Sequence, residues 1–302
     1  MNGLKRSIIK VMKNHHIPVL LSEVLANLQP SLHESYLDLT AGYGGHAESI
    51  LDVTQNYKDS VLVDRDEYAA NYLKDKFNGK NITIMNTDFY NATLQLLECG
   101  KTFDIILADF GVSSPQLDNG ERGFSIKEEG PLDMRMDRRQ PLTASDVVNK
   151  YSEYELAEIF VKYGEEPSGR AKMIAREIVH NRPLTTTKEL ADLIAKHSRY
   201  SHIHPATKVF QAIRIVVNGE LTQIEQTLPL LPKLLNQNGR LGIITFHSLE
   251  DRLVKNFFKE ASSHGEESEL TLVAKKPIVA GPNELVINPR ARSSKLRVAT
   301  RN

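Results

Sequence analysis

Several common chemistries are excluded by what this sequence of 302 residues lacks. It contains one cysteine, Cys99, so it can form neither an internal disulfide framework nor a zinc site built from several cysteines. It has no run of about eighteen apolar residues, which argues against a membrane-spanning helix. The first residues also lack the apolar centre of a secretory signal. We therefore expect a cytoplasmic protein without a membrane partner.

Net charge is absent as well. The 38 basic residues balance the 38 acidic ones, so global charge gives no sign of nucleic-acid binding. Both ends of the chain are nevertheless basic: residues 271–302 carry seven basic residues against Glu284 alone, and the segment before Glu23 has four basic residues and no acid. His15 and His16 in that segment lack further ligands at a recognisable spacing, so we expect no metal site.

Short apolar runs alternate with helical patterns in the first third of the chain. We expect strands at 36–39, 60–64, 82–86 and 103–109, a later one at 239–248, and edge strands at 269–276 and 295–301. Helical patterns follow the first three strands. This alternation predicts a parallel sheet with crossover helices, as in a doubly wound α/β domain.

The alternation stops after the fourth strand. About thirty polar, turn-rich residues follow, longer than an ordinary connection, and then helices without strands. Capping patterns of the S/T-x-x-D/E type mark two helix starts, at Thr143 and Ser152. We predict a core formed by 1–112 and 205–302, with an all-helical insertion at 113–204 that binds the substrate.

A glycine cluster joins the first expected strand to its helix. Gly42, Gly44 and Gly45 lie there, where small residues let a ligand approach the backbone and a helix N-terminus favours polar or anionic groups. Asp64 follows Gly44 by twenty residues, a spacing that suits a carboxylate bound to ribose hydroxyls. This spacing fits both NAD and S-adenosylmethionine, and a solvated strand end is the alternative interpretation of Asp64.

Asp38 favours one of these cofactors. It ends the first strand, and D-L-T-A-G-Y-G-G is similar to the acid-then-glycine motif of methyltransferases that use S-adenosylmethionine. The G-x-G-x-x-G motif of dinucleotide enzymes would need glycine at His46 or Ala47 and is absent. The expected cofactor is therefore S-adenosyl-L-methionine.

Two more strand ends carry candidate residues. Asp88 and Phe89 follow the third strand and could bind an adenine by hydrogen bonding and stacking, although Phe89 could equally pack under a loop. Asp109 ends the fourth strand, at the crevice where open α/β sheets bind ligands. It is the strongest acidic candidate. The letters D-F-G at 109–111 do not indicate a kinase, because no other kinase motif accompanies them.

The fifth strand leads into F-H-S-L-E-D-R. Ser248 with Asp251 fits a helix-capping pattern. His247 is expected to support the site without touching the reactants, with contact to the target base as the alternative.

Seven segments together resemble the bacterial 16S ribosomal RNA (cytosine-N(4)) methyltransferases of the MraW type. They lie at 16–25, 38–46, 109–118, 122–137, 214–221, 246–255 and 288–297. The resemblance implies a Rossmann-like class I S-adenosylmethionine-dependent methyltransferase sheet with an inserted all-helical subdomain. It also implies methylation of the exocyclic 4-amino group of a cytosine in the decoding region of 16S rRNA. The cofactor-contact positions implied by it are Gly44, Gly45, His46, Asp64, Phe89, Asp109 and Gln116.

The residues suit methylation of an amine, which needs positioning and a proton acceptor but no covalent intermediate. Methylation at carbon 5 would need a cysteine nucleophile, and Cys99 precedes the fourth strand, where we expect it to pack. Asp109 is the catalytic candidate. The sequence D-F-G-V-S-S-P departs from the pattern of other amino-methyltransferases, so Asp109 could hold the cofactor, the amine, or both in turn.

The expected partner is 16S rRNA within a small ribosomal subunit or its precursor, bound by a monomer or a homodimer. Candidate RNA contacts are the basic segment 288–297 and the arginines Arg135, Arg138 and Arg139, although charge runs are usually solvated. The target base must leave its stack to reach the cofactor. Two other functions remain open: a nucleotide-dependent oxidoreductase and a ribosome-assembly factor without catalysis.

Overall fold

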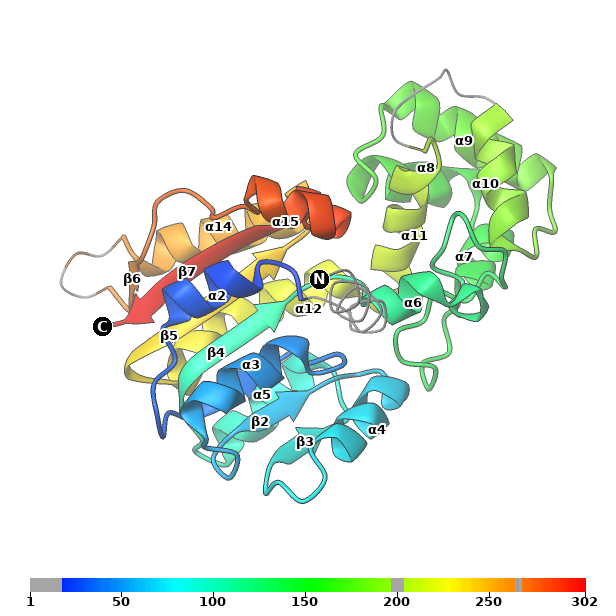
Figure 1. Cartoon of the computed structure of the whole chain (residues 1–302). Coiled ribbons are helices and arrows are strands. Elements are labelled where there is room, and N and C mark those ends of the chain that lie inside the picture. The colour runs from blue at the N-terminus through cyan, green and yellow to red at the C-terminus, as the bar shows by residue number, and fades with distance from the viewer. Residues whose placement is uncertain (1–17, 197–203, 264, 266–267) are drawn as a thin grey trace, which may run out of the picture. The chain divides into compact units, whose positions relative to one another are not determined.

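The computed structural model describes residues 18–196, 204–263, 265 and 268–302, and the chain divides into two compact units (Figure 1). The core unit comprises Met1–Gly111 and Thr227–Asn302, and the helical unit comprises Val112–Gln226. The basic N-terminal segment, with His15 and His16, lies outside the described residues. Within the described part of the chain, no helix has the length and apolar character needed to span a bilayer.

The core unit is built on one sheet of seven strands. These are β1 (Tyr36–Asp38), β2 (Val61–Val63), β3 (Thr83–Met85), β4 (Phe103–Asp109), β5 (Leu235–Thr245), β6 (Leu270–Leu272) and β7 (Lys295–Arg301). Their order is β3-β2-β1-β4-β5-β7-β6; β1 to β5 are parallel, and β7 is antiparallel to both of its neighbours. The predicted Rossmann-like α/β class is confirmed.

The prediction that β7 is an edge strand was wrong. It pairs with β5 from Lys295 to Thr300 and with β6 on its other side. Leu296, Val298 and Ala299 are buried. The alternating basic residues of this strand resemble the charges that protect a sheet edge, but Lys295 and Arg297 are held by an internal carboxylate described below.

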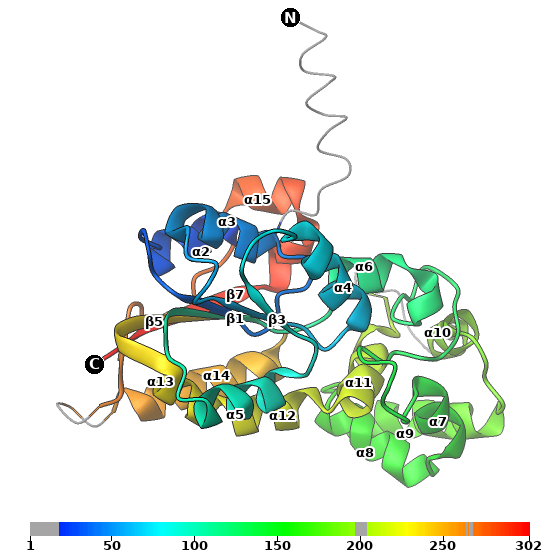
Figure 2. The ribbon, with the colours of Figure 1, turned by 90° about the horizontal axis from the view of Figure 1, so that it is seen from below.

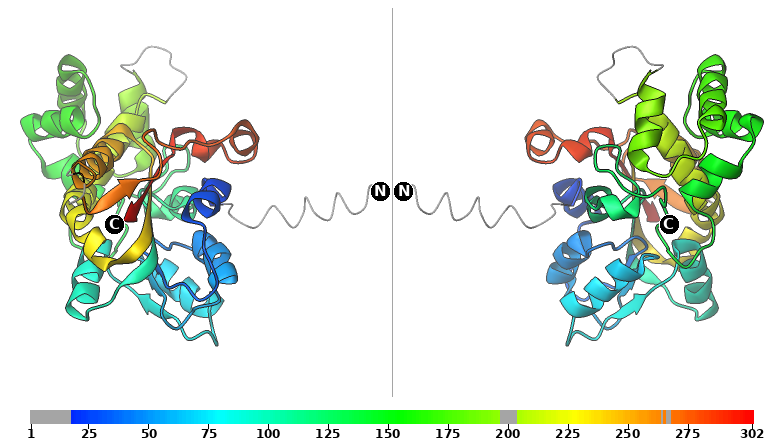
Figure 3. Two further views of the ribbon diagram at one scale, coloured as in Figure 1. Left: turned by 90° about the vertical axis from the view of Figure 1, so that its left-hand side faces the viewer. Right: turned by 90° about the vertical axis from the view of Figure 1, so that its right-hand side faces the viewer.

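Helices cover both faces of the sheet (Figure 2 and Figure 3). One face carries α2 (Leu21–Leu28), α3 (Gly45–Thr54) and α15 (Pro282–Ile287), and the other carries α5 (Phe89–Glu98), α13 (Leu231–Leu234) and α14 (Ser248–Ala261). A further helix, α4 (Glu67–Lys76), joins β2 to β3. Because both faces are covered, the central strands read as continuous apolar runs. Leu37, Leu62 and Ile105 are fully buried, each contributing about 1.5–3 kcal/mol.

The helical unit has its own apolar core. Its elements are α6 (Ser114–Asp118), the 3₁₀ helix η2 (Gly120–Arg122), α7 (Ala144–Lys150), α8 (Glu153–Lys162), α9 (Ser168–His180), α10 (Thr187–Lys196), α11 (Thr207–Asn218) and most of α12 (Glu220–Thr227). Both predicted caps, Thr143 and Ser152, form reciprocal capping boxes. The unit extends past the predicted boundary at 204, because α11 buries Val209 and Ile213 in the same core.

The long polar stretch after β4 is fixed inside the helical unit by buried polar side chains. Asn218 donates to the carbonyl of Met134 at 2.8 Å, and its side-chain oxygen accepts from the amide of Met136 at 2.8 Å. Arg122 donates to the carbonyls of Arg135 and Met136. Because these bonds satisfy buried backbone groups, this segment is ordered without strands or long helices of its own.

Candidate functional site

Acidic side chains gather at the carboxyl edge of the core sheet. Asp38 ends β1, Asp64 follows β2, Asp109 ends β4, and Glu250 lies in the first turn of α14, which follows β5. Asp38 and Glu250 are 2% and 0% exposed. Asp109 interacts electrostatically with both, and Asp38 with Asp64. The three acidic residues predicted from the sequence, Asp38, Asp64 and Asp109, therefore belong to one cluster.

Asp64 ties the glycine turn to the second strand. Its Oδ2 accepts a hydrogen bond of 2.8 Å from the amide of Gly42, and its Oδ1 accepts one of 2.8 Å from the amide of Asp66. The side-chain amide of Asn86 donates to the carbonyl of Asp64 from the neighbouring strand end. Burial raises the pKa of Asp64 to about 6. Asp64 is half-buried and accepts two backbone hydrogen bonds, so it is more than a solvated strand end, and its contact with ribose stays a prediction.

The three glycines of the turn are present for different physical reasons. A Cβ at Gly44 would lie 2.9 Å from Cδ2 of Leu73, and a Cβ at Gly45 would lie 2.5 Å from Cγ of Pro18, so the packing of the chain requires both glycines. Gly42 has a φ of +53°, yet nothing lies within 3.9 Å of its Cβ position except a carbonyl at that distance. Gly42 is therefore the glycine that leaves open space beside the turn.

Two hydrogen bonds orient the carboxylate of Asp38. Its Oδ2 accepts a hydrogen bond of 2.7 Å from the hydroxyl of Tyr36, and its Oδ1 accepts one of 3.1 Å from the amide of Thr40. Burial raises the pKa of Asp38 to about 7, although these two bonds oppose the shift. Tyr36 is fully buried, so this orientation of Asp38 is set by the core of the sheet.

Asp109 has the least compensated carboxylate of the cluster. Its amide donates to the hydroxyl oxygen of Thr40 at 2.6 Å, which joins the ends of β1 and β4. Its Oδ2 lies 3.8 Å from Nε2 of His46, beyond hydrogen-bond distance. Its Oδ1 is buried and has no hydrogen-bond partner among the described residues. Burial, Asp38 and Glu250 hold the pKa of Asp109 well above its usual value.

Two phenylalanine rings meet beyond the ends of β3 and β4. The ring of Phe89 lies 5.3 Å from that of Phe110, centroid to centroid, at 45°. Phe89 is half-buried and Phe110 is buried. Asp88 acts as the N-cap of α5, since its Oδ1 accepts from the amide of Asn91 at 2.9 Å. In the structure Asp88 therefore acts as a helix cap. The exposed portion of the Phe89 ring can still contact a planar ligand.

The segment after β5 caps its helix differently from the predicted pattern. The N-cap is His247, not Ser248, and its partner is Glu250, whose Oε2 accepts from the amide of Phe246 at 2.8 Å. Nε2 of His247 lies 3.1 Å from Oε1 of Glu250. The predicted box of Ser248 with Asp251 was wrong, because Glu250 is drawn inward to the backbone amides at the end of β5.

Asp251 instead binds the basic residues of β7. Its two carboxylate oxygens lie 2.9 Å from Nζ of Lys295 and 2.8 Å from Nε of Arg297. Burial alone would raise the pKa of Asp251, but these bonds bring it below its usual value. Two of the basic residues predicted to contact RNA are therefore engaged inside the core unit, while Arg290 and Arg292 are exposed.

The remaining predicted residues lie in the helical unit. Gln116 is buried in α6, and its side-chain oxygen accepts from the amide of Ser113 at 3.1 Å in a capping box. Arg135 pairs with Asp133 at 2.7 Å and donates to two carbonyls, so it stabilises the loop. Arg139 pairs with Asp137 at 2.8 Å. The pairings neutralise part of the predicted basic patch.

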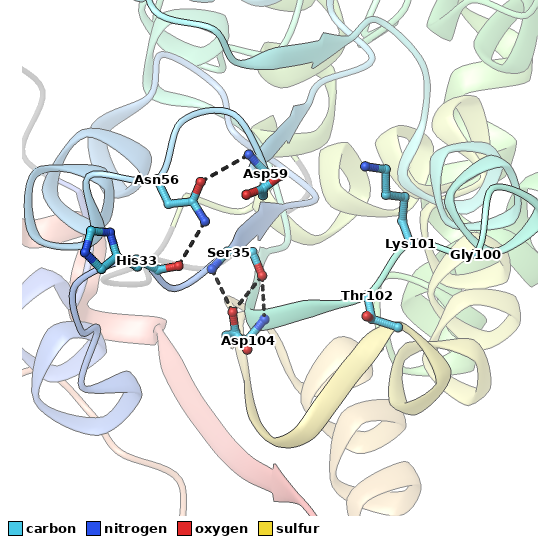
Figure 4. Close-up of a pocket in the computed structure, with 8 residues that line it drawn as sticks. All are labelled: His33, Ser35, Asn56, Asp59, Gly100, Lys101, Thr102 and Asp104. Atoms are coloured by element: carbon cyan, nitrogen blue, oxygen red, sulfur yellow. Dashed lines mark hydrogen bonds between the residues drawn. The ribbon is translucent and has the colours of Figure 1, made fainter.

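A hollow of about 370 Å³ lies at the opposite, amino-terminal edge of the sheet (Figure 4). Its polar groups bond one another: Ser35 donates to Asp104 through its amide and hydroxyl, both at 2.8 Å, and Asn56 donates to the carbonyl of His33. Parallel sheets bind ligands at the carboxyl ends of their strands. This hollow is therefore not the candidate site.

Cys99 corrects a smaller prediction. It was expected to pack in the interior, but it is exposed at the end of α5. That helix end leads into the start of β4, so Cys99 lies at the edge of the sheet away from the carboxylate cluster. Its reactivity therefore has no part in the candidate site.

Comparison with known proteins assigns the family. The pattern of the MraW methylase family matches residues 13–302. Ribosomal RNA small subunit methyltransferase H of Trichodesmium erythraeum is 46% identical over 292 residues, which cover 94% of this chain and 98% of that protein. The protein of the same name from Gloeothece citriformis is 44% identical, with 99% and 98% covered. A solved rRNA methylase from Streptococcus thermophilus has a TM-score of 0.41 and 9% identity, with 93% and 92% covered. This chain belongs to the MraW methylase family.

Proposed function

We propose that this protein transfers a methyl group from S-adenosyl-L-methionine to the exocyclic 4-amino group of a cytosine in the decoding region of 16S rRNA. The membership in the MraW family and the name shared by its relatives support a small-subunit rRNA substrate. The buried carboxylate cluster at the carboxyl edge of the core sheet supports the cofactor. The choice of the amine and of the decoding region rests on the resemblance of the sequence motifs to the cytosine-N(4) methyltransferases.

The charge of the cluster favours a cationic ligand. Asp109 is repelled by both Asp38 and Glu250 in a poorly solvated site, and buried charges are stable only when they are compensated. Oδ1 of Asp109 has no hydrogen-bond partner in the described part of the chain, so it can receive one from a ligand. A dinucleotide would bring a pyrophosphate toward these carboxylates, which disfavours the oxidoreductase alternative.

The residues present fit S-adenosylmethionine. Asp64 would bind the ribose hydroxyls, since a carboxylate oxygen has a further lone pair beyond those used by Gly42 and Asp66. Phe89 would contact the adenine, and the open side of Gly42 would admit the ligand to the backbone. When bound, the cofactor supplies a methyl group on a positively charged sulfur. His46 and Gln116 remain candidates for contact by resemblance.

Asp109 is the proposed proton acceptor. Methyl transfer would form a nitrogen–carbon bond, break a sulfur–carbon bond and release one proton from the amine, which Asp109 would accept as the positive charge on sulfur is lost. A cation beside Asp109 lowers the pKa of its carboxylate, and the loss of that cation lets burial, Asp38 and Glu250 raise it again. Asp109 can therefore be ionised before the transfer and take up the proton afterwards. The net charge around the carboxylates stays constant.

The helical unit is the proposed RNA-binding part. It carries exposed basic side chains such as Arg138 and Arg139, about half exposed. A reaction on ribosomal subunits would take place in the cytoplasm. Carbon-5 methylation is disfavoured, because the single cysteine of the sequence lies at the wrong edge of the sheet.

One experiment tests donor, acceptor and reaction together. Purified protein is incubated with methyl-labelled S-adenosylmethionine and with small ribosomal subunits from a strain that lacks this protein. The rRNA nucleosides are then analysed by mass spectrometry. We expect label in N4-methylcytidine, and none with Asp109→Asn that still binds the cofactor. Label in another nucleoside would refute the acceptor. No label, with active controls, would favour an assembly factor without catalysis.

A further inference from the structure

Three tyrosine rings meet on the surface beside the glycine turn. Tyr43 belongs to the turn itself, and Tyr68 and Tyr72 lie one helical turn apart on α4. The ring centroid of Tyr43 is 6.2 Å from that of Tyr68 and 5.0 Å from that of Tyr72, at 53° and 56°. Tyr68 is 69% exposed and Tyr72 is 45% exposed. We call these three residues the tyrosine cluster.

The fold of the core unit does not account for this exposure. The buried face of α4 consists of Ala69, Ala70 and Leu73, and only Leu73 of these belongs to the apolar core on that side of the sheet. Tyr68 and Tyr72 occupy the outer face at i and i+4 spacing. Large aromatic side chains on an outer face remain in contact with water unless a partner covers them, and such residues are enriched at binding surfaces.

The cluster is held in place from within the core unit. Nζ of Lys76, one turn after Tyr72, lies 3.3 Å from the carbonyl oxygen of Tyr43 and 3.2 Å from that of Gly44. The same ammonium pairs with Glu48 on α3 at 2.9 Å. Asp66 caps the start of α4 by accepting from the amide of Tyr68. The rings are thus carried by backbone that is tied to the proposed cofactor turn.

We propose that the tyrosine cluster stacks one or two unpaired nucleotides of the RNA substrate. This inference rests on the proposed function and adds an RNA-contact surface to it. Every nucleobase has a π face, and proteins bind single-stranded RNA by stacking bases on aromatic side chains. A phenol also offers a hydroxyl that can donate to phosphate or sugar.

The chemistry of α4 favours RNA over a protein partner. Its exposed large apolar residues are the two tyrosines, without an exposed Val, Leu, Ile or Phe in this fully described helix. The buried centre of a protein interface is more apolar than the rest of the surface, whereas α4 adds no exposed aliphatic side chain to its two rings. The charges on α4 are mixed, with Glu67 and Asp75 beside Lys74 and Lys76. Binding here would therefore depend on stacking and little on counterion release.

The test compares substitutions that remove or keep the rings. The double variant Tyr68→Ala with Tyr72→Ala is compared with Tyr68→Phe with Tyr72→Phe. The control is Leu32→Ala, which removes a large apolar side chain 59% exposed in the core unit, between α2 and β1. For each protein, the dissociation constants for naked 16S rRNA and for small subunits from a deficient strain are measured across salt concentrations. Calorimetry gives the affinity for S-adenosylmethionine.

We expect the alanine pair to weaken RNA binding by about tenfold or more, with an unchanged salt slope and unchanged cofactor affinity. The phenylalanine pair and Leu32→Ala should bind within about twofold of the unmodified protein. Unchanged RNA affinity in the alanine pair would overturn the inference. So would an equal loss of cofactor affinity, which would indicate a structural role, or a loss seen with subunits but not with naked RNA, which would indicate a ribosomal protein.

The proposed function is tested separately by the nucleoside analysis. If the unmodified protein binds RNA through the tyrosine cluster but labels no cytosine amine, the proposed function fails and the surface stands. If it labels the amine while the alanine pair binds RNA normally, the surface fails and the function stands. If the unmodified protein binds neither form of the RNA, both fail.

Discussion

The hydroxyl of Tyr36, the first residue of β1, donates a hydrogen bond of 2.7 Å to Oδ2 of Asp38, the last, and both side chains are buried. Oδ1 of Asp38 accepts from the amide of Thr40, whose hydroxyl oxygen accepts from the amide of Asp109. The ends of β1 and β4 are thus joined through side chains as well as through the sheet. The position of Asp109 therefore depends on the buried side chains of Tyr36 and Asp38, through Thr40.

Tyr36→Phe should weaken the folded state and the site together. The hydrogen bond from Tyr36 lowers the pKa of Asp38, so its removal raises that pKa and leaves a buried carboxylate less satisfied. We expect a loss of about 1–3 kcal/mol in the free energy of unfolding near neutral pH, measured by denaturant titration. Tyr154→Phe removes a 2.6 Å bond to Glu158 at an exposed position and should cost far less. Equal losses would contradict a special role for Tyr36.

The raised pKa of Asp38 predicts a pH dependence of stability. A carboxyl group that binds its proton more tightly when folded stabilises the protein below its ordinary pKa of 3.8, and this contribution is lost as pH rises toward about 7. For Asp38 alone the loss is about 4 kcal/mol at most. Asp64, with a pKa of about 6, acts in the same direction.

Asp38→Asn should flatten the fall in unfolding free energy between about pH 4 and 7, measured without ligand. Asp251→Asn is the control of opposite sign. The pKa of Asp251 is lowered, so its contribution is present above 3.8 and is lost as pH falls. A wild-type protein whose stability does not decrease between pH 4 and 7, after correction for Asp251, would contradict the assignment.

Asp109 should change its protonation with the charge of the bound ligand. Calorimetry in buffers of different ionisation enthalpy gives the protons taken up when S-adenosylmethionine or S-adenosylhomocysteine binds. We expect the uncharged product to bind with the uptake of about one more proton near neutral pH, and Asp109→Asn to abolish this difference. The titratable groups that interact with Asp109 are Asp38, Glu250, His46 and Tyr36.

The comparison variants identify the acceptor. Asp59→Asn, in the hollow at the other edge of the sheet, should leave the difference intact. If Asp38→Asn abolishes the difference while Asp109→Asn keeps it, the proton belongs to Asp38.

Two glycines of the same turn should respond differently to alanine. Gly44→Ala adds a Cβ at 2.9 Å from Leu73 to a residue with φ +70°, and we expect it to lower the free energy of unfolding by about 2 kcal/mol or more. Gly42→Ala meets no atom closer than 3.9 Å, so its cost comes from φ alone, about 1 kcal/mol. Its methyl group should instead weaken cofactor binding. Thermal unfolding and calorimetry on both variants measure the two effects, and the reverse ranking would contradict the assignment.

Alanine substitutions of two nearby arginines should likewise differ in their effects on stability and on RNA binding. Arg297→Ala leaves Asp251, 13% exposed, with Lys295 alone, and should cost about 1–3 kcal/mol of unfolding free energy. Arg292→Ala, at an exposed position, should change stability by less than about 0.5 kcal/mol and weaken RNA binding a few-fold. Stability and RNA affinity are measured for both. A destabilised Arg292→Ala would show that Arg292 also has a structural role.

The sheet and the acidic strand ends could be predicted because they depend on short-range rules. Strand–helix alternation indicates parallel strands, and parallel strands bring their carboxyl ends to one edge. The sequence positions of Asp38, Asp64 and Asp109 therefore sufficed to predict a common site. The capping boxes at Thr143 and Ser152 likewise involve groups three residues apart.

Other features depend on partners that are distant in the chain. Asp251 faces Lys295 and Arg297, which lie more than forty residues away, so neither the false capping box nor the apparent edge strand could be recognised locally. Position 44 requires glycine because a Cβ there would clash with Leu73, which lies on another helix. The meeting of Tyr43 with Tyr68 and Tyr72 is of the same kind.

The sequence by itself thus determined the class of fold, the edge of the sheet that carries the acids and the family of the protein. Local backbone preference and apolar periodicity are written in consecutive residues. The tertiary structure decided which carboxylates are buried, which are compensated and which aromatic rings stay exposed. Those properties depend on desolvation and on distances between remote segments, which only the folded chain sets.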